Sequence, residues 1–450
     1  MSQTVTARTG RVTFEVPDHW TAEDPGRSEV DALAFLAGPQ GDFAPNAVLT
    51  VNSFTGSVAE FAVSALENIT TVLTDAVVID VLPWEPSSGL ADSPSDTGRL
   101  IVYTHRSPST GARLRVAEWL VAGQGLAVQL TTTTSVSQWT VFDSTMWAIA
   151  GSLRIDGLEH PSAPAAGGGA IPPPARDEFL TELTGHPVER IHGLASRQPY
   201  PNEGGWLHGS AVKLLSELAE GLKIGRLNAG DYAEPLAMLS EVGLVQGTSL
   251  TEDGHTLGHF LSQPDVSVRI TGHFGGQTPS FQAWTLGGHA LIAASTGYIA
   301  ATEGVNGGQP SHDHFNIQVV NLDRLTTLMA QWVGLQPAWS LPVFPMVLPE
   351  DRVDARWAGD GTFPEGASET MQRLWHENWY LWDMLLVSEE TEVGPVSYLN
   401  GGRMGHYRMA TEPLGTQRGF ALVPTPAVSI VDQMEDALQS CLYGRQPRMK

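Results

Sequence analysis

The chain has 450 residues, which is long enough for two or three domains of ordinary size. It carries 49 Asp and Glu against 25 Lys and Arg, a net charge of −24, so it lacks the positive surface that binding to nucleic acid or to an anionic membrane requires. Only 16% of the residues are charged and 42% are hydrophobic, which predicts folded domains with buried cores.

The N-terminal segment has no basic stretch followed by an apolar one, so no secretory signal is readable. No apolar run approaches the roughly 18 residues that a membrane span needs. We therefore expect a cytoplasmic protein with no membrane partner. The single cysteine, Cys441, excludes an internal disulfide and a cysteine-based zinc site.

The first third of the chain predicts an α+β domain with an antiparallel sheet flanked by helices. Alternating strands are expected at residues 11–16 and 47–54, followed by a helix that Ser57 and Glu60 begin as a capping box. A second helix is expected over about residues 137–153. Between the helices lie four runs rich in β-branched residues, at 77–82, 100–105, 114–121 and 126–133.

This order of elements, with VTFEVPDHW at 12–20 and PNAVLTV at 45–51, resembles the Mog1/PsbP-like fold, including small actinobacterial lipoproteins of the LpqN type. The resemblance covers roughly residues 10–156 of a domain predicted at 1–158, and it implies a binding platform more than a catalyst. Residues 161–174 are crowded with Pro, Ala and Gly, which is typical of a linker. We expect residues 159–204 to be a linker and irregular connection before a second domain at 205–450.

The second domain predicts two similar halves, each with helices, then strands, then a helix. Its expected helices include a tryptophan-rich one at 368–387 and an amphipathic one at 426–442 that closes the chain. The other expected helices lie at 211–222, at 232–242 and from Asp323 onward, and strands are expected at 266–274, 280–285, 290–295, 316–320, 396–399, 406–409 and 419–423.

Three stretches of this domain, with their order and spacing, resemble the EspG family. They are LSEVGLVQG leading to PDVSVRI (239–270), FQAWTLGGHALIAAS (281–295) and GPVSYLNGGRMGHYRM (394–409). The resemblance implies a cytosolic chaperone of type VII (ESX) secretion, whose partners are small helical secreted proteins. A Gly-, His- and Asp-rich insert at 304–314 departs from the family pattern.

Trp375, Trp379 and Trp382 recur at helical spacing in the expected helix 368–387. Such a series is usually part of a core. The alternative is an exposed aromatic groove, because large rigid rings dominate protein interfaces, and these three are then the partner-binding residues.

His312, Asp313 and His314 are candidate ligands for zinc or iron, because both metals accept nitrogen and oxygen donors. Neighbouring loop residues need further ligands to hold a metal, and the spacing places none. No Gly-x-Ser-x-Gly elbow or phosphate-binding loop is present. We therefore expect no metal, no cofactor and no enzymatic activity, and a metal-dependent hydrolase is the third hypothesis.

The main rival to a secretion chaperone is a winged-helix transcriptional regulator or signalling adaptor, because residues 239–261 look like part of a winged helix. Residues 205–262 carry 3 basic against 7 acidic side chains, which disfavours contact with DNA phosphates. The leading hypothesis is thus a non-enzymatic chaperone or adaptor for helical cargo.

Overall fold

The computed structural model describes residues 1–26, 29–38, 43–85, 89–90, 98–123, 125–156, 178, 181–182, 191, 193–225, 230–303 and 313–444. The chain divides into two compact units, Met1–Leu194 with Gln336–Ala338, and Ala195–Leu335 with Trp339–Lys450. The division falls inside the connection predicted at 159–204, whose Pro/Gly-rich part lies outside the described residues. Residues 195–204 belong to the second unit.

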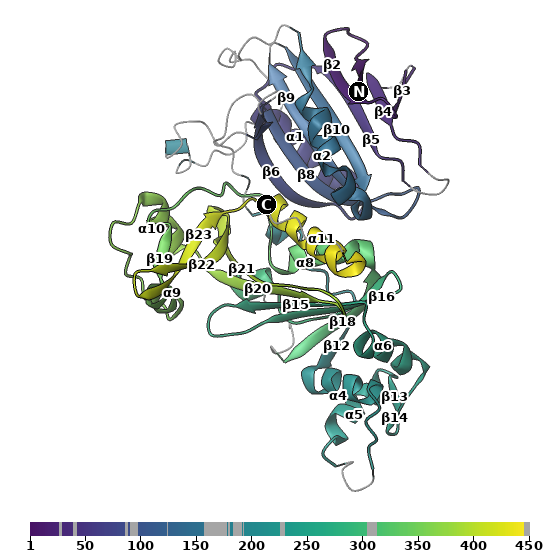
Figure 1. Ribbon diagram of the computed structural model, residues 1–450, viewed down its shortest axis with the longest axis vertical. Coiled ribbons are helices and arrows are strands. Elements are labelled where there is room, and N and C mark those ends of the chain that lie inside the picture. The colour runs from purple at the N-terminus through teal and green to yellow at the C-terminus, as the bar shows by residue number, and fades with distance from the viewer. Residues whose placement is uncertain are drawn as a thin grey trace. The chain divides into compact units, whose positions relative to one another are not determined.

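The first unit is built on an eight-stranded sheet in which every neighbouring pair is antiparallel (Figure 1). Across the sheet the strands are β3 (Thr21–Glu23), β4 (Ala32–Phe35), β5 (Asn46–Ser53), β10 (Leu126–Ser135), β9 (Arg113–Gly123), β8 (Gly98–Arg106), β6 (Val77–Glu85) and β7 (Gly89–Leu90). A small sheet pairs β1 (Ser2–Thr6), β2 (Val12–Pro17) and β11 (Arg154–Ile155).

Strand β9 lies at the centre of this unit and is buried along nearly its whole length. Because successive side chains of a strand point to opposite faces, both faces of the sheet are covered here. Helix α1 (Val58–Val72) packs against β8 and β9, and α2 (Val136–Gly151) packs against β9 and β10. The predicted capping box of α1 is confirmed, since the Ser57 Oγ accepts from the Glu60 N–H and the Glu60 carboxylate accepts from the Ser57 N–H.

The second unit holds a ten-stranded antiparallel sheet made of two five-stranded halves. From the middle outward, the first half is β15 (Val266–His273), β16 (Ser280–Leu286), β17 (His289–Ala294), β18 (His314–Asn321) and β12 (Gly205–His208). The second half repeats this order with β20 (Tyr380–Val387), β21 (Glu392–Asn400), β22 (His406–Leu414), β23 (Gln417–Pro424) and β19 (Val347–Pro349).

The two halves meet where β15 pairs with β20, with Ile270 opposite Met384. In each half the strand that comes first in the chain takes the outermost place, beside the strand that comes last. The expected α+β class and the two similar halves of the second domain are therefore confirmed.

The helices follow the same repetition. In the first half, three helices follow the outermost strand β12 in the chain and precede the innermost strand β15: α4 (Gly209–Ala219), α5 (Ala233–Glu241) and α6 (Glu252–Ser262). A small hairpin of β13 (Val245–Gln246) and β14 (Ser249–Leu250) comes before α6. In the second half α9 (Glu350–Trp357) and α10 (Glu369–His376) take this place. The final helices of the two halves, α8 (Leu325–Trp332) and α11 (Ala427–Tyr443), pack on each other (Figure 1).

The prediction of one helix over 368–387 is wrong. Ser368 begins α10 by accepting the Met371 N–H on its Oγ, but the helix ends at His376, and Glu377 has an extended backbone. The following residues form β20, which pairs with β15 on one side and β21 on the other. Tertiary pairing thus overrides a local spacing that also fits a helix.

No helix among the described residues is both long and apolar enough to cross a membrane.

Candidate functional site

The three tryptophans predicted to bind a partner lie inside the second unit. Trp375 is on α10, Trp379 follows it and Trp382 is on β20, with exposed fractions of 2%, 8% and 1%. The rings of Trp375 and Trp379 meet edge to face at 5.2 Å, and Trp382 stacks on Tyr398 at 4.4 Å. These side chains therefore belong to the core and present no exposed aromatic groove.

Two of the three candidate metal ligands are among the described residues. His312 lies outside the described residues, Asp313 is in a turn and His314 begins β18. His314 lies opposite His208 of β12, with the two rings 5.2 Å apart. Within the described ranges, no three or more His, Cys, Asp or Glu side chains come together as metal ligands. This part of the chain therefore does not assemble the site that a metal-dependent hydrolase needs.

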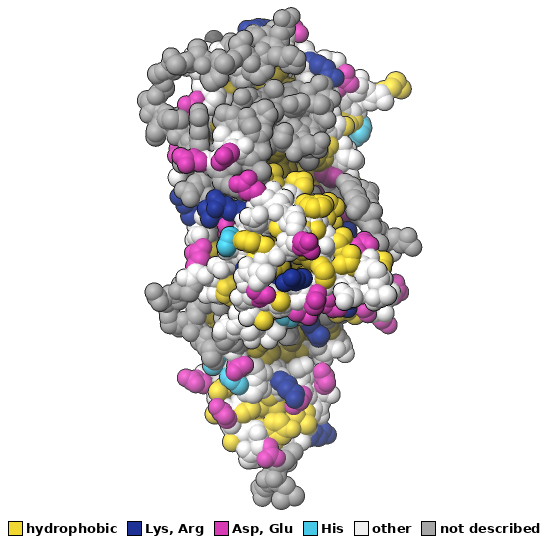
Figure 2. Space-filling view, turned by 90° about the vertical axis from the view of Figure 1, so that its left-hand side faces the viewer, with side chains coloured by type: hydrophobic (Ala, Val, Ile, Leu, Met, Phe, Trp, Pro, Cys, Tyr) yellow, Lys and Arg dark blue, Asp and Glu magenta, His cyan; other side chains and the backbone are white. Residues whose placement is uncertain are grey.

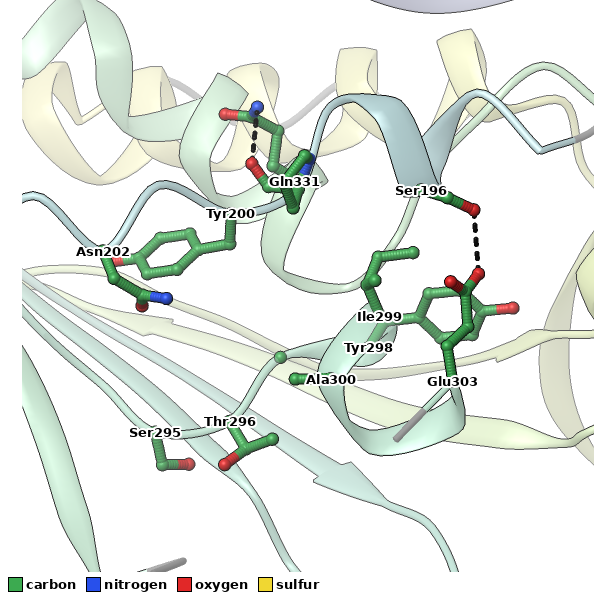
Figure 3. A pocket seen from close by; sticks show the side chains of 12 residues that line it. Ser196, Tyr200, Asn202, Ser295, Thr296, Tyr298, Ile299, Ala300, Glu303 and Gln331 are labelled. Carbon is green, nitrogen blue, oxygen red and sulfur yellow. Dashed lines mark hydrogen bonds between the residues drawn. The ribbon is translucent and has the colours of Figure 1, made fainter. Parts of the chain in front are cut away.

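A cavity of about 350 Å³ lies in the first half of the second unit (Figure 3). One wall is the segment from Ser196 to Asn202, which includes the short helix η1 (Ala195–Arg197). The opposite wall is formed by the residues that follow β17 and by α7 (Tyr298–Glu303), and Gln331 of α8 also lines the cavity.

Hydrogen bonds hold these walls in place. Gln331 donates from its Nε2 to the carbonyls of Gln198 and Pro199, both at 3.3 Å. Tyr200 packs edge to face against Phe281 and accepts a hydrogen bond from Gln318. The segment at 196–202 is therefore anchored to α8 and to the sheet, so this wall of the cavity is pre-formed.

The floor of the cavity is formed by the short segment between β17 and α7, which two hydrogen bonds hold in place. The Ser295 Oγ accepts from the Ser280 N–H at 2.7 Å, and the Trp332 indole donates to the Ser295 carbonyl at 2.9 Å. Figure 3 shows Ser295 and Thr296 below the cavity, with Tyr200 on one side and Ile299 and Tyr298 on the other. Five of the twelve lining residues carry a hydroxyl group, and two of these five are tyrosines.

The cavity carries a carboxylate but, among its described lining residues, no Lys, Arg, His or Cys. The Glu303 carboxylate accepts a hydrogen bond from the Ser196 Oγ at 2.8 Å (Figure 3). Burial raises the pKa of Tyr298 to about 12, and the neighbouring carboxylates of Glu303 and Glu377 contribute to the rise. Among the described lining residues, no histidine accompanies Ser196 or Ser295.

Sequence reasoning did not identify this cavity. Its walls come from segments about a hundred residues apart, 196–202 and 295–303, and neither carries a motif. The one available signal was the insert at 304–314, which follows α7 directly in the chain.

A second notable feature is the apolar surface at the outer end of the second half. Four large apolar side chains are exposed on β22, β23 and the segment before β19, and we call them the outer apolar surface: Phe344 (63%), Met346 (49%), Leu414 (38%) and Val423 (42%). Trp357 of α9 is also exposed (38%), but its ring lies 5.2 Å from that of His273 on β15, in the middle of the sheet. Helix α9 contacts β19 and β23, so these elements form one end of the sheet. Figure 2 shows hydrophobic side chains gathered at the level of these elements.

The first unit contains a buried carboxyl group. Glu118 of β9 is 6% exposed, and its Oε1 accepts a hydrogen bond from the Tyr103 hydroxyl at 2.8 Å. Its Oε2 is buried with no hydrogen-bond partner among the described residues. Burial raises the pKa of Glu118 to about 7, which the hydrogen bond from Tyr103 partly opposes.

Neither a scan of family models nor a search of curated proteins finds a match to this chain. Among solved structures, the PsbP protein CyanoP of Synechocystis sp. PCC 6803 matches with 12% identity and a TM-score of 0.26, over 34% of this chain and 92% of its own. The Ran-binding protein Mog1p of Saccharomyces cerevisiae matches with 10% identity and a TM-score of 0.25, over 34% and 95%.

LpqN of Mycobacterium tuberculosis, which is described as involved in cell envelope biogenesis, matches with 15% identity and a TM-score of 0.26, over 34% of this chain and 90% of its own. This likeness to solved structures concerns the fold alone. The EspG resemblance of the second unit stays a prediction.

Proposed function

We propose that this protein is a non-enzymatic, cytosolic chaperone or adaptor that binds helical cargo of type VII secretion, and that its second unit is EspG-like. The two similar halves of the second unit are compatible with this proposal.

The outer apolar surface is the observation that carries this proposal. Exposed apolar patches on proteins mark sites of protein contact, and these side chains lie on neighbouring elements at one edge of the sheet. The outer end of the first half exposes fewer large apolar side chains, Val242 and Val319. Since the two halves share one topology, the exposure in the second half is not a requirement of the fold.

The position of Phe344 and Met346 suits contact with a helix. They lie in the bent segment just before β19, where the Met346 carbonyl accepts the Leu422 N–H at 2.8 Å. Both side chains are exposed, at 63% and 49%. Phe and Met adapt well to the apolar face of an amphipathic helix.

The edge strand itself does not invite pairing with another strand. Pro345 comes shortly before β19 and Pro349 is its last residue, and proline has no N–H to donate. We therefore assign recognition to side chains rather than to strand addition.

The test is capture of partners from the cytosol of the native host by the tagged full-length protein, with identification by mass spectrometry. We expect small helical secreted proteins to be retained by the wild type and lost with the double variant Phe344→Asp/Met346→Asp. Val141→Asp is the matched control, because Val141 of α2 is also exposed (56%) but lies in the other unit. Failure of the wild type to retain any such protein would refute the proposal.

The winged-helix regulator remains the alternative, because α5, the β13–β14 hairpin and α6 form a compact helix–hairpin–helix segment. Glu252 and Asp253 lie exposed in the first turn of α6, where they repel phosphates. A salt-sensitive shift of duplex DNA in a gel would support this alternative, and no shift at low salt would remove it.

A further inference from the structure

The two halves of the second unit differ at the connection between their last two strands. In the second half, β22 and β23 are joined by a tight turn, with Leu414 opposite Gln417. In the first half, the equivalent strands β17 and β18 are joined through α7 and the insert that follows it. The second half shows that the sheet does not need this longer connection.

The longer connection forms a wall of the cavity. Tyr298, Ile299, Ala300 and Glu303 of α7 all line it. A volume of about 350 Å³ lies within the range of small-molecule sites in proteins. The feature that distinguishes the first half from the second is therefore also what creates a binding-sized cavity.

The side chains that line the cavity favour a positively charged ligand. Glu303 is the single ionised group among the described lining residues, and its hydrogen bond from the Ser196 Oγ holds the carboxylate in position. Tyr200 and Tyr298 supply aromatic walls that are only 8% and 7% exposed, so they offer apolar contact surface rather than open ring faces.

The charges outside the cavity partly compensate one another. Burial raises the pKa of the Tyr200 phenol and Glu203 adds to the rise, while the hydrogen bond from Gln318 and the charge of Arg324 oppose it. Glu303 and Glu377 add to the rise at Tyr298. Two of these outer carboxylates are paired, Glu203 with Arg324 at 3.2 Å and Glu377 with Arg403 at 2.6 Å. Within the described part of the chain, Glu303 is hydrogen-bonded by the neutral Ser196 hydroxyl and forms no ion pair.

We propose that this cavity binds an organic cation, a guanidinium or primary ammonium group on a short aliphatic stem, with Glu303 as its counter-ion and Tyr200 and Tyr298 as its aromatic walls. A carboxylate binds a guanidinium through charge-assisted, two-pronged hydrogen bonds, while the aliphatic stem packs on the rings. This site does not depend on the outer apolar surface, so either proposal can fail alone.

The cationic group can belong to a free small molecule or to a basic side chain of a bound protein. The experiment is calorimetric titration of the full-length protein with two cationic probes, agmatine and the capped tripeptide Ala-Arg-Ala. The tripeptide Ala-Cit-Ala, in which neutral citrulline replaces arginine, is the matched control. We expect at least one cationic probe to bind and the citrulline peptide to bind at least tenfold more weakly.

Binding of agmatine without the arginine peptide assigns the site to a free small molecule, and binding of the peptide assigns it to a basic side chain. Glu303→Gln should weaken either by at least tenfold, and the exposed position of Glu303 makes a folding defect unexpected. Glu412→Gln, at an exposed position on β22, should leave binding unchanged. The proposal is overturned by equal binding of arginine and citrulline peptides, by unaltered binding to Glu303→Gln, or by no saturable binding of either cation up to about 10 mM.

Discussion

The buried Glu118 should make the stability of the first unit depend on pH. Its pKa is about 7 in the folded protein against an ordinary value of 4.5. Because the folded state favours the protonated carboxyl, its contribution to stability is fully present below pH 4.5, declines as the pH rises, and is lost above about pH 7. At 1.36 kcal/mol per pKa unit, the loss across this interval is about 3 kcal/mol.

Replacing the carboxyl with an amide isolates this effect. Glu118→Gln keeps an oxygen that can accept the Tyr103 hydroxyl but cannot ionise. Relative to wild type at pH 8, removing the ionisable group should raise the free energy of unfolding of the first unit by about 3 kcal/mol. This gain is reduced by the cost of burying an amide that has no second hydrogen-bond partner, about 1–3 kcal/mol. The pH dependence is the cleaner readout, because the amide cost is the same at every pH.

The assay is thermal unfolding of the full-length protein followed by calorimetry at pH 5, 6, 7 and 8. We expect the difference between Glu118→Gln and wild type to grow in favour of the variant across this series. Tyr103→Phe removes a hydrogen bond that lowers the pKa of Glu118, and should therefore move the wild-type transition to higher pH. Glu67→Gln, at an exposed position on α1, is the control and should change nothing. Parallel pH profiles for Glu118→Gln and wild type would refute the reasoning.

Three further changes test the packing and local structure described above. Trp382→Ala should cost about 3–5 kcal/mol of stability in the second unit, because it empties a buried site against Tyr398, and denaturant unfolding measures this. Ser57→Ala should destabilise the first unit by about 1 kcal/mol through loss of its cap, seen as a lowered midpoint in thermal melts. Gly334→Ala should destabilise the second unit by more than about 1 kcal/mol, because φ is +71° and a Cβ there would overlap the Tyr298 ring; an unchanged melting temperature would contradict this.

Local patterns were strong enough to predict most elements of both units. The capping box at Ser57, the strand alternation at 47–54 and the apolar stripe of the final helix each depend on residues a few positions apart, and all three are confirmed. The order of helices, then strands, then a helix occurs twice along the chain, so the sequence predicted the two halves of the second unit without information on how their strands pair.

The tryptophan-rich segment shows where this reasoning fails. Trp375, Trp379 and Trp382 fit a helical spacing, yet the chain leaves the helix after His376 because β20 fills the place between β15 and β21. Pairing partners more than a hundred residues away in the chain decide this, and no local pattern reports them. The same long-range packing buries the rings and removes the groove that the spacing suggested.

The sequence by itself determined that the protein is acidic, α+β and divided into two parts, because composition and short-range periodicity carry that information. Only the tertiary structure decided which chemistry-bearing residues meet. It brought Ser196 to Glu303 and buried Glu118 beneath Tyr103, and it left Phe344 and Met346 exposed. The physical reason is that burial and charge pairing are properties of the packed sheet and of its two unequal halves.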